Sequence, residues 1–597
     1  MPTHHPDLDF ARIRAHHGSR DLGFEELLRQ LLIAGPPADC ARLEHKGPGA
    51  DGGVEVLAHL STGDLIGYQS KYFINDFGDN QIRQIRTSFS RALSAYPRMV
   101  RYVVALPRNL SGSPDHNSMR RKWDQFVSDA EAQAAALGRS VVVDLWDESA
   151  LVAHLTPGDP IHAGLRLFFF DDVVLTNAWF RERFATTRAE LQDRYLPEDH
   201  VDVEAQHLLD VAARGPRFGA AIAAHRGTYL NALEALQRLE LKAKPHAPTA
   251  PWAAVSQTLE AARDTAFGID FDTTGPIDLS RLRAALEPVQ RGPEVRALVD
   301  AIHELSRAET VGDETRGTLQ RLAWGLGDAM DTIVSSFGKL DLPLLMSPRL
   351  LVVGEAGVGK SHSLAHLVDR QIDSCGAAVL FLGQQFASGD PRGQMLSRLG
   401  LPGIAFETFL GAMNAAALAS GRPSLLVIDA VNESEAPHLW STSLAGLAAD
   451  VARFPNLALV VSCRDIYEAH CIPSGWNGTR HRHLGFEGDA AAAAKAYLDR
   501  HGIDRPAAPF LDPTFTNPLF LSTCVRRLVA EGRTAFPTGL DGITQLFDFW
   551  LDGVEASLVR RGYRRIRRGD GRLRAALRRF ADQLALERRE ELPLAQA

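Results

Sequence analysis

Residues 354–361 have the sequence Gly-Glu-Ala-Gly-Val-Gly-Lys-Ser, whose residue types and spacing point most directly to chemistry. They fit the P-loop pattern G-x-x-x-x-G-K-S/T, in which glycines let backbone N–H groups wrap the phosphates of a nucleotide. An apolar run precedes the motif and a helical pattern follows it, so a helix N-terminus adds its dipole to the site. The residues predicted to bind the nucleotide are Gly354, Gly357, Gly359, Lys360 and Ser361.

The last two residues of the motif predict ATP and Mg²⁺ as cofactors. We expect the Lys360 ammonium at the β- and γ-phosphates and the Ser361 hydroxyl on the metal ion. Such a site needs an acid at the end of a neighbouring buried strand. Asp429 follows the apolar run 425–428 and is expected to hold Mg²⁺ through water. The sequence therefore predicts an ATPase.

Two further polar residues follow buried runs, and each has two interpretations. Glu433 lies four residues after Asp429, where it either orients the attacking water or is a solvated loop acid. Arg464 ends the run 457–463, where it either senses the γ-phosphate or forms a structural ion pair. The spacing alone does not decide between these roles.

A second group of polar residues lies near the N-terminus. Asp51 stands in a glycine turn that leads into a strand-like run, and Glu55 follows it within Gly-Gly-Val-Glu. The next run carries Gln69 and Lys71, which share one face of a strand because side chains alternate with period two. Asp51 and this face could converge on one metal ion, as phosphodiester cleavage requires. Polar turns and strand faces are also common in α/β domains without such a site.

These N-terminal residues resemble the PD-(D/E)xK nuclease superfamily, and in particular its Mrr-like branch, in which D-G-G-x-D/E is followed by Q-x-K. The resemblance implies that Asp51 and Gln69 are metal ligands, that Lys71 is the catalytic lysine and that Glu25 completes the metal shell. It leaves open whether Glu25 or Glu26 points inward. Double-stranded DNA is the implied substrate. Acids and bases nearly balance across 1–170, so no basic groove is expected, and DNA binding would depend on local patches or on several copies.

The hydrophobic periodicity changes along the chain. Strand-like runs at 54–60, 65–71, 100–106 and 141–145 alternate with helical stripes, which predicts a mixed sheet flanked by helices. From 177 to 339 the pattern is helical almost throughout. Apolar runs at 350–353, 379–382, 425–428 and 457–461 then predict a buried parallel sheet. Beyond about 489 the pattern is helical again.

The C-terminal motifs together resemble a STAND NTPase, the signalling class that includes NACHT modules. The P-loop, the strand end 428–433, the turn 462–465 and Thr-Asn-Pro-Leu-Phe-Leu at 516–521 occur in the order of that family. The resemblance implies that Pro518 lies in a helical lid and touches the nucleotide base. The Arg-rich segment 560–579 is either the start of a winged helix or a solvated basic helix face.

We therefore expect an α/β multidomain protein with five parts. These are a nuclease domain at 1–170, a helical connector at 171–345, a P-loop STAND NTPase core at 346–488, a helical lid at 489–545 and a partial winged-helix region at 546–597. The five scattered cysteines argue against a disulfide framework or a zinc site and favour the cytoplasm. No run approaches the ~20 apolar residues of a membrane span.

A nuclease followed by a connector and a STAND module resembles the antiviral AVAST-type ATPases of bacteria, and the segment 191–198 resembles a recurring element in them. The resemblance implies a phage protein as trigger, a C-terminal sensor that is expected to be missing here, and an active homo-oligomer. The 597-residue chain alone is then expected to be mainly monomeric and a poor nuclease. Two alternatives remain, an NTP-dependent restriction endonuclease and a signalling scaffold with an inactive nuclease domain.

Overall fold

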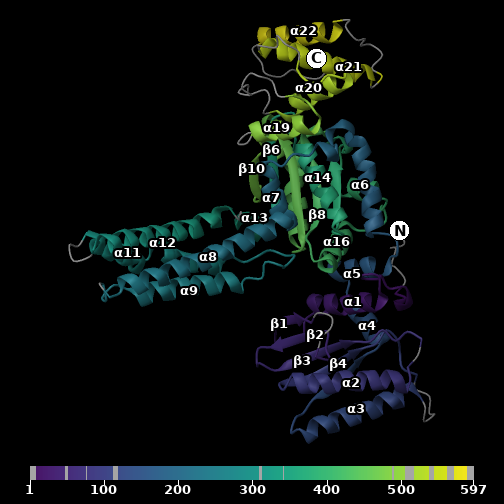
Figure 1. Ribbon diagram of the computed structural model, residues 1–597. Coiled ribbons are helices and arrows are strands. Elements are labelled where there is room, and N and C mark those ends of the chain that lie inside the picture. The colour runs from purple at the N-terminus through teal and green to yellow at the C-terminus, as the bar shows by residue number, and fades with distance from the viewer. Residues whose placement is uncertain are drawn as a thin grey trace.

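The structure is a computed structural model of the 597-residue chain. It describes residues 8–46, 52–75, 77–111, 118–245, 247–307, 312–339, 342–486, 490–504, 517–536, 543–560, 562 and 571–587. Two α/β units lie end to end, a long helical arm projects to one side, and a group of helices lies at the C-terminal end (Figure 1). The protein is therefore an α/β multidomain chain, as the sequence predicts.

The N-terminal unit contains a mixed five-stranded sheet. Its strands are β1 (Cys40–His45), β2 (Val56–Leu60), β3 (Leu65–Ser70), β4 (Met99–Ala105) and β5 (Val142–Trp146), in that spatial order. The first three strands pair antiparallel, and β3, β4 and β5 pair parallel. The four expected strands are confirmed, but β1 was missed. This edge strand carries Arg42 and Glu44 and is partly exposed, so it lacks an apolar pattern.

Helices cover both faces of this sheet. Helix α1 (Arg20–Ala34) packs on the face of Tyr68, whereas α2 (Asp79–Ala95) and α3 (Met119–Ala136) pack on the face of Tyr102. Side-chain alternation assigns the other strand residues to these two faces. Two further helices, α4 (Glu148–Leu155) and α5 (Pro160–Phe170), complete the unit.

A close helix–helix contact joins the N-terminal unit to the second one. Helix α5 packs against α16 (Phe406–Ser420), and both contribute a glycine at the crossing. A Cβ atom on Gly164 would lie 2.2 Å from the carbonyl carbon of Gly411. Only glycine therefore permits this approach of the two backbones.

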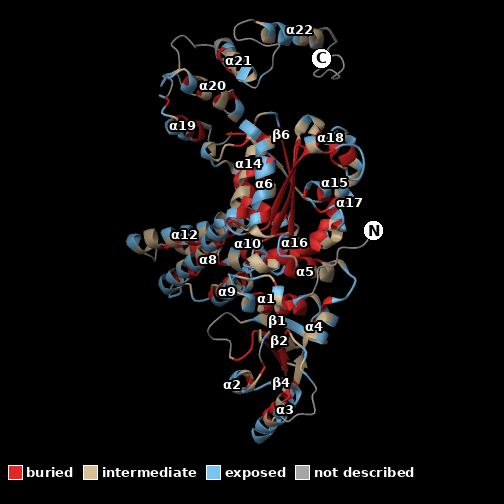
Figure 2. Cartoon of the chain, turned by 90° about the vertical axis from the view of Figure 1, so that its right-hand side faces the viewer, coloured by how far each residue is buried: buried red, intermediate tan, exposed pale blue. Residues whose placement is uncertain are grey.

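The second unit contains a parallel five-stranded sheet. Its strands are β6 (Arg349–Gly354), β7 (Ala378–Leu382), β8 (Ser424–Asp429), β9 (Leu457–Arg464) and β10 (Thr479–Arg482), and their spatial order is β10-β6-β9-β8-β7. The four expected strands are confirmed, and their central residues are buried (Figure 2). Strand β10 was missed because its sequence Thr-Arg-His-Arg is polar and lies at the sheet edge.

Helices from distant parts of the sequence surround this sheet. They are α6 (Asn177–Leu191), α7 (Glu204–Ala213), α13 (Leu342–Met346), α14 (Lys360–Asp373), α15 (Pro391–Arg398), α16, α17 (His438–Ala452) and α18 (Glu468–Cys471). Both α6 and α7 contact α14, which follows the P-loop motif. The first part of the expected helical connector thus packs on the second α/β unit.

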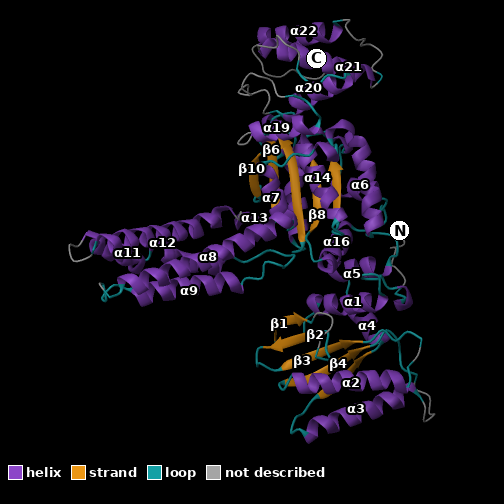
Figure 3. Cartoon of the chain, in the orientation of Figure 1, coloured by secondary structure: helices purple, strands orange, loops and turns teal. Residues whose placement is uncertain are grey.

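The rest of the connector forms the arm. It consists of α8 (Pro216–Ala243), α9 (Trp252–Gly268), α10 (Ser280–Arg291), α11 (Pro293–Arg307) and α12 (Asp313–Lys339), joined by loops (Figure 3). The arm has its own apolar contacts, and Tyr229, Trp252 and Leu259 are buried within it. The helical prediction for this segment is confirmed.

The C-terminal helices are α19 (Ala490–Arg500), α20 (Pro518–Ala530), α21 (Ile543–Arg560) and α22 (Arg572–Glu587). A separate apolar cluster, which includes Leu498, Leu521 and Val525, holds the first three together. The expected winged-helix region falls partly outside the described residues, at 561, 563–570 and 588–597. Among the described helices, none combines the length and the apolar character that a membrane crossing needs.

Candidate functional site

The glycine-rich loop 354–361 connects β6 to α14 at the carboxyl end of the parallel sheet. Gly357 and Gly359 have φ angles of 81° and 100°, a left-handed backbone that glycine adopts without strain. Gly359 is the N-cap of α14, and it has no side chain with which to cap the first N–H groups of the helix. The loop and the helix N-terminus thus form a backbone site suited to an anion.

Lys360 begins α14 and points back into the loop. Its Nζ donates hydrogen bonds to the carbonyl oxygens of Gly354 and Glu355, each at 2.7 Å. The residue is only 8% exposed, and this burial lowers the pKa of Lys360, while the carboxylate of Asp429 opposes the shift. The ammonium therefore lies in a buried loop where phosphate oxygens can replace the two carbonyl acceptors.

Asp429 is the last residue of β8. Its side chain is held by Ser462 of β9, the strand that lies between β8 and β6. The sequence led us to expect Asp429 on a strand next to the loop strand, but β9 separates the two. Ser462 of β9 donates a hydrogen bond to Asp429 Oδ1 at 2.6 Å and accepts one from the Ala430 N–H at 2.7 Å. Asp429 is 1% exposed, and burial raises the pKa of its carboxyl group, against the effect of the Ser361 and Ser462 hydroxyls.

These residues fit a nucleotide with Mg²⁺. The second carboxylate oxygen of Asp429 is buried and accepts no hydrogen bond of normal length from a described residue, although the Ser361 hydroxyl is close enough to lower the pKa of the carboxyl group. Mg²⁺ is commonly held by one or two protein oxygens together with waters and substrate phosphates. Ser361 and Asp429 would supply such oxygens. Within the described ranges, no cluster of three or more His, Cys, Asp or Glu side chains could hold a metal ion by itself.

Two arginines hold Glu433 near the carboxyl end of the sheet. Arg464 Nη2 lies 2.8 Å from Glu433 Oε1, and Arg194 Nη1 lies 3.1 Å from Glu433 Oε2. Arg464 pairs across the sheet with Gly354, the first residue of the loop. The structure thus places Arg464 in an ion pair, the second of the two interpretations that the sequence allowed. It also shows Glu433 as a paired acid rather than a purely solvated one.

Helix α20 lies directly on the loop. The Leu519 N–H donates to the Gly357 carbonyl at 3.1 Å, and Asn517 Nδ2 donates to the Ala356 carbonyl at 3.2 Å. A Cβ atom on Gly359 would lie 3.7 Å from Cγ of Pro518. The motif at 516–521 and the P-loop motif are therefore neighbours in space. Thr516 itself lies outside the described residues.

His483 is a buried neighbour of the loop that sequence reasoning missed. It follows β10, and the Gly485 N–H donates to its Nδ1 at 3.0 Å, which leaves the ring proton on Nε2. Its Nε2 lies 3.4 Å from Ser363 Oγ on α14. Burial lowers the pKa of His483 to about 3, so the ring is neutral beside Lys360. No local signal predicts this residue, because β10 itself was missed.

The segment that follows α6 connects the loop helix to the C-terminal helices. We call residues 192–202 the strap. Tyr195 Oη donates to Asp369 of α14 at 2.6 Å, and Asp199 lies 2.8 Å from the ring of His501 beyond α19. The resemblance singled out 191–198, but only the structure shows what this segment contacts.

A stack of histidines lies where the strap crosses α14. The ring of His200 stacks on His366 with a centroid distance of 3.5 Å, and His362 lies beside them. Burial lowers the pKa of each of these three histidines to about 4, with their neighbours adding to the shift. The rings are therefore neutral at pH 7.

The polar residues of the N-terminal unit meet on the Tyr102 face of its sheet. Gln69 of β3 is fully buried, and its amide nitrogen donates to a carboxylate oxygen of Glu55. The Tyr102 hydroxyl lies 3.3 Å from Gln69 Oε1 and 3.0 Å from the Gly53 carbonyl oxygen. Lys71 follows β3 and has the same side-chain parity as Gln69. Among the residues that the structure describes, Glu55 is an acid in contact with Gln69.

The two helix glutamates, Glu25 and Glu26, do not lie at this site. Asp51 is outside the described residues. Glu25 lies on α1, on the opposite face of the sheet, where its carboxylate is 3.5 Å from the ring of His45. Glu26 is buried and pairs with Arg29 at 2.6 Å, at the contact with α16. Of these two glutamates, Glu25 is the more accessible.

No protein-family model matches the chain, and none of the curated proteins matches its sequence.

Proposed function

We propose that the chain is an ATP-dependent switch of the STAND type. The observation that carries this proposal is the buried, unpartnered oxygen of Asp429, which lies with Lys360 and Ser361 at the end of a parallel sheet. A buried carboxylate oxygen without a partner is unfavourable unless a ligand completes it. A nucleotide with Mg²⁺ would give this oxygen a partner, and its phosphates would provide acceptors for the Lys360 ammonium.

The proposed roles follow from the positions of these residues. Lys360 exchanges two carbonyl acceptors for phosphate oxygens, while Ser361 and Asp429 hold Mg²⁺. When bound, ATP with Mg²⁺ supplies a phosphoanhydride whose γ-phosphoryl group can pass to water. Glu433 orients that water, and the two arginines that pair with Glu433 fix its position. The docking of α20 on the loop supports the role of Pro518 near the nucleotide.

We further propose that the N-terminal unit cleaves double-stranded DNA with Mg²⁺. The contact between Glu55 and Gln69, with Lys71 two residues on, supports this activity. In this proposal Gln69 and an acid of the 51–55 turn hold the metal ion, and Lys71 stabilises or deprotonates the attacking water. Glu55 joins Asp51 as a candidate acid, because Glu55 contacts Gln69.

The combination supports a role in antiphage defence. A nucleotide switch joined to a nuclease fits a protein in which ATP favours an oligomer, triggered by a phage protein, and clustering then activates DNA cleavage. The strap supports such coupling, since it contacts the Glu433 ion pair, α14 and His501 at once.

Two measurements on purified protein test the proposed function. The wild type should bind ATP in a titration with Mg²⁺, and Asp429→Asn should weaken binding in Mg²⁺ more than binding in EDTA. DNA cleavage should disappear in Lys71→Ala while ATP binding persists, because the two sites lie in different units. DNA cutting that persists in Lys71→Ala would refute the proposed nuclease. ATP binding that no substitution in the loop 354–361 changes would refute the proposed nucleotide site.

A further inference from the structure

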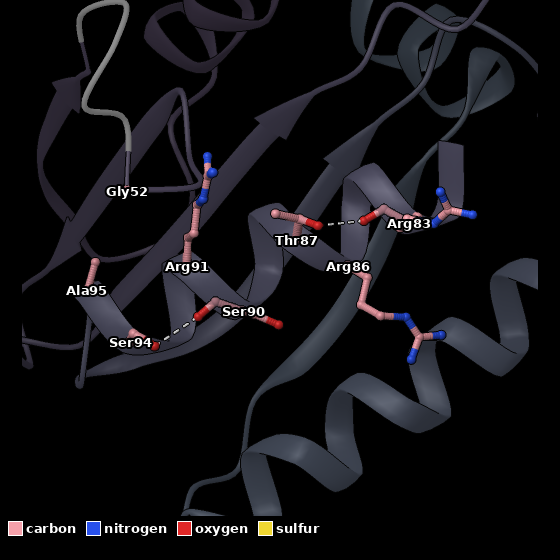
Figure 4. Close-up of a pocket in the computed structure, with 8 residues that line it drawn as sticks. All are labelled: Gly52, Arg83, Arg86, Thr87, Ser90, Arg91, Ser94 and Ala95. Atoms are coloured by element: carbon pink, nitrogen blue, oxygen red, sulfur yellow. Dashed lines mark hydrogen bonds between the residues drawn. The ribbon is translucent and has the colours of Figure 1, made fainter. Parts of the chain in front are cut away.

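The outer face of α2 forms a wide groove that the proposed chemistry does not use. The groove has a volume of about 760 Å³ and is lined by Gly52, Arg83, Arg86, Thr87, Ser90, Arg91, Ser94 and Ala95 (Figure 4). Three of these residues are arginines, three carry hydroxyl groups, and none is acidic. Such a lining offers hydrogen-bond donors to an anionic partner.

The groove adjoins the glycine turn of the candidate nuclease site. Gly53 has a φ of 87°, and a Cβ atom there would lie 2.0 Å from the Ser88 carbonyl oxygen of α2. A Cβ atom on Gly52 would lie 2.7 Å from the Tyr96 hydroxyl at the end of α2. The turn is therefore seated against the helix that carries the arginines. The Tyr102 hydroxyl links the same turn to Gln69.

The arginines of the groove differ in their partners. Arg86 pairs with Asp129 of α3 at 2.8 Å. Arg83 and Arg91 are exposed, and neither forms an ion pair with any residue that the structure describes. They lie eight residues apart on one helix, which corresponds to about 12 Å along its axis. Along one strand of a DNA duplex, this length spans about three to four phosphates.

We propose that the α2 groove binds the phosphate backbone of double-stranded DNA and delivers it to the glycine turn at Gly52. This inference rests on the proposed nuclease function, because it assigns a substrate surface to that site. The unit as a whole carries slightly more acidic than basic residues, so general attraction does not hold DNA there. Arg83 and Arg91, which form no ion pair with a described residue, supply the local attraction to phosphate. The hydroxyls of Thr87 and Ser94 already donate to backbone carbonyls of α2, and the Ser90 hydroxyl donates to Gln133, so the arginines carry the binding.

The test compares the full chain with the double variant Arg83→Ala/Arg91→Ala. Binding to a fluorescent DNA duplex of about 30 base pairs is followed by anisotropy between about 50 and 200 mM salt, in EDTA so that the DNA stays intact. We expect the double variant to bind DNA at least about ten-fold more weakly. The fall of log K with log salt concentration should become shallower, by about two in the magnitude of its slope. Unchanged affinity and slope would overturn the proposal.

Arg101→Gln is the matched control. Arg101 is an exposed arginine of the same unit, it pairs with Asp144, and it lies on the opposite face of the sheet from α2. We expect Arg101→Gln to leave the DNA affinity unchanged. If Arg101→Gln lost as much affinity as the double variant, net charge alone would explain the effect and the proposed α2 groove would be wrong. Circular dichroism of each variant checks the fold.

A cleavage assay in Mg²⁺ separates this inference from the proposed nuclease. If the groove is wrong, the arginine variant binds DNA like the wild type although Lys71→Ala still abolishes cutting. If the nuclease is wrong, Lys71→Ala has no effect on any cutting although the arginine variant still loses binding.

Discussion

Replacement of Lys360 by alanine tests the nucleotide site most sharply. In the structure its ammonium makes two hydrogen bonds of 2.7 Å inside a loop where it is 8% exposed. In the complex we expect these bonds to go to the β- and γ-phosphates instead. Hydrogen bonds to charged groups contribute about 1.5–3 kcal/mol each, so Lys360→Ala should lose about 3–6 kcal/mol of binding free energy. This corresponds to a weakening of ATP binding by about 10²- to 10⁴-fold.

The assay is a calorimetric titration with ATP and Mg²⁺, with Lys360→Met as a second variant that keeps the apolar stem without the charge. Both variants should lose binding. In the protein without nucleotide, Lys360→Ala loses two hydrogen bonds to carbonyl oxygens. It also removes the unfavourable burial of the ammonium group, which lowers the pKa of Lys360, and the two effects on stability oppose each other. We therefore expect the melting temperature to change by less than about 4 °C. Affinity within about three-fold of wild type, in a folded variant, would refute the reasoning.

Three further predictions follow from other residues. Lys71→Ala should abolish Mg²⁺-dependent cleavage of plasmid DNA on a gel without changing ATP affinity. Arg194→Ala removes one of the two arginines that pair with Glu433 and should lower the ATP turnover rate about five-fold, or about 1 kcal/mol. Arg181→Ala, which breaks an exposed ion pair with Asp373, should leave the turnover rate unchanged. Burial lowers the pKa of His200 to about 4, so its contribution to stability is present above pH 6.5 and is lost as the pH falls through 4. In His200→Gln the melting temperature should fall less steeply between pH 6.5 and pH 4 than in the wild type. An unchanged pH dependence would contradict the assignment of this loss of stability to His200.

The sequence predicted those features that depend on local pattern. The loop 354–361 is recognisable because eight consecutive residues encode its geometry, and the central strands are recognisable as continuous apolar runs. The edge strands β1 and β10 were missed because exposed edges need no apolar pattern. Their absence from the prediction also hid His483, which follows β10.

Contacts between distant segments could not be predicted from spacing. The position of Ser462 between Asp429 and the loop strand depends on the order of strands in the sheet, which no local signal encodes. The same is true of the contact between Arg194 and Glu433, whose residues are far apart in the sequence. Alternation predicted that Gln69 and Lys71 share one face. Gln69 lies on the Tyr102 face, whereas Lys71 follows the end of β3 and the direction of its side chain stays a prediction. The contact with Gln69 adds Glu55 as a candidate ligand, whereas Asp51 lies outside the described residues.

The proposed function requires that the nucleotide state controls DNA cleavage within one chain. The most direct test measures plasmid cleavage in Mg²⁺ with and without ATP, over a range of protein concentrations, with size-exclusion chromatography of the same samples. Monomeric protein without ATP should cut weakly. Cutting should increase with ATP and rise more steeply than linearly with protein concentration. It should be absent in Lys71→Ala, and in Lys360→Ala it should stay at the weak level of the ATP-free protein. Efficient cutting by a monomer without ATP would contradict the proposed function.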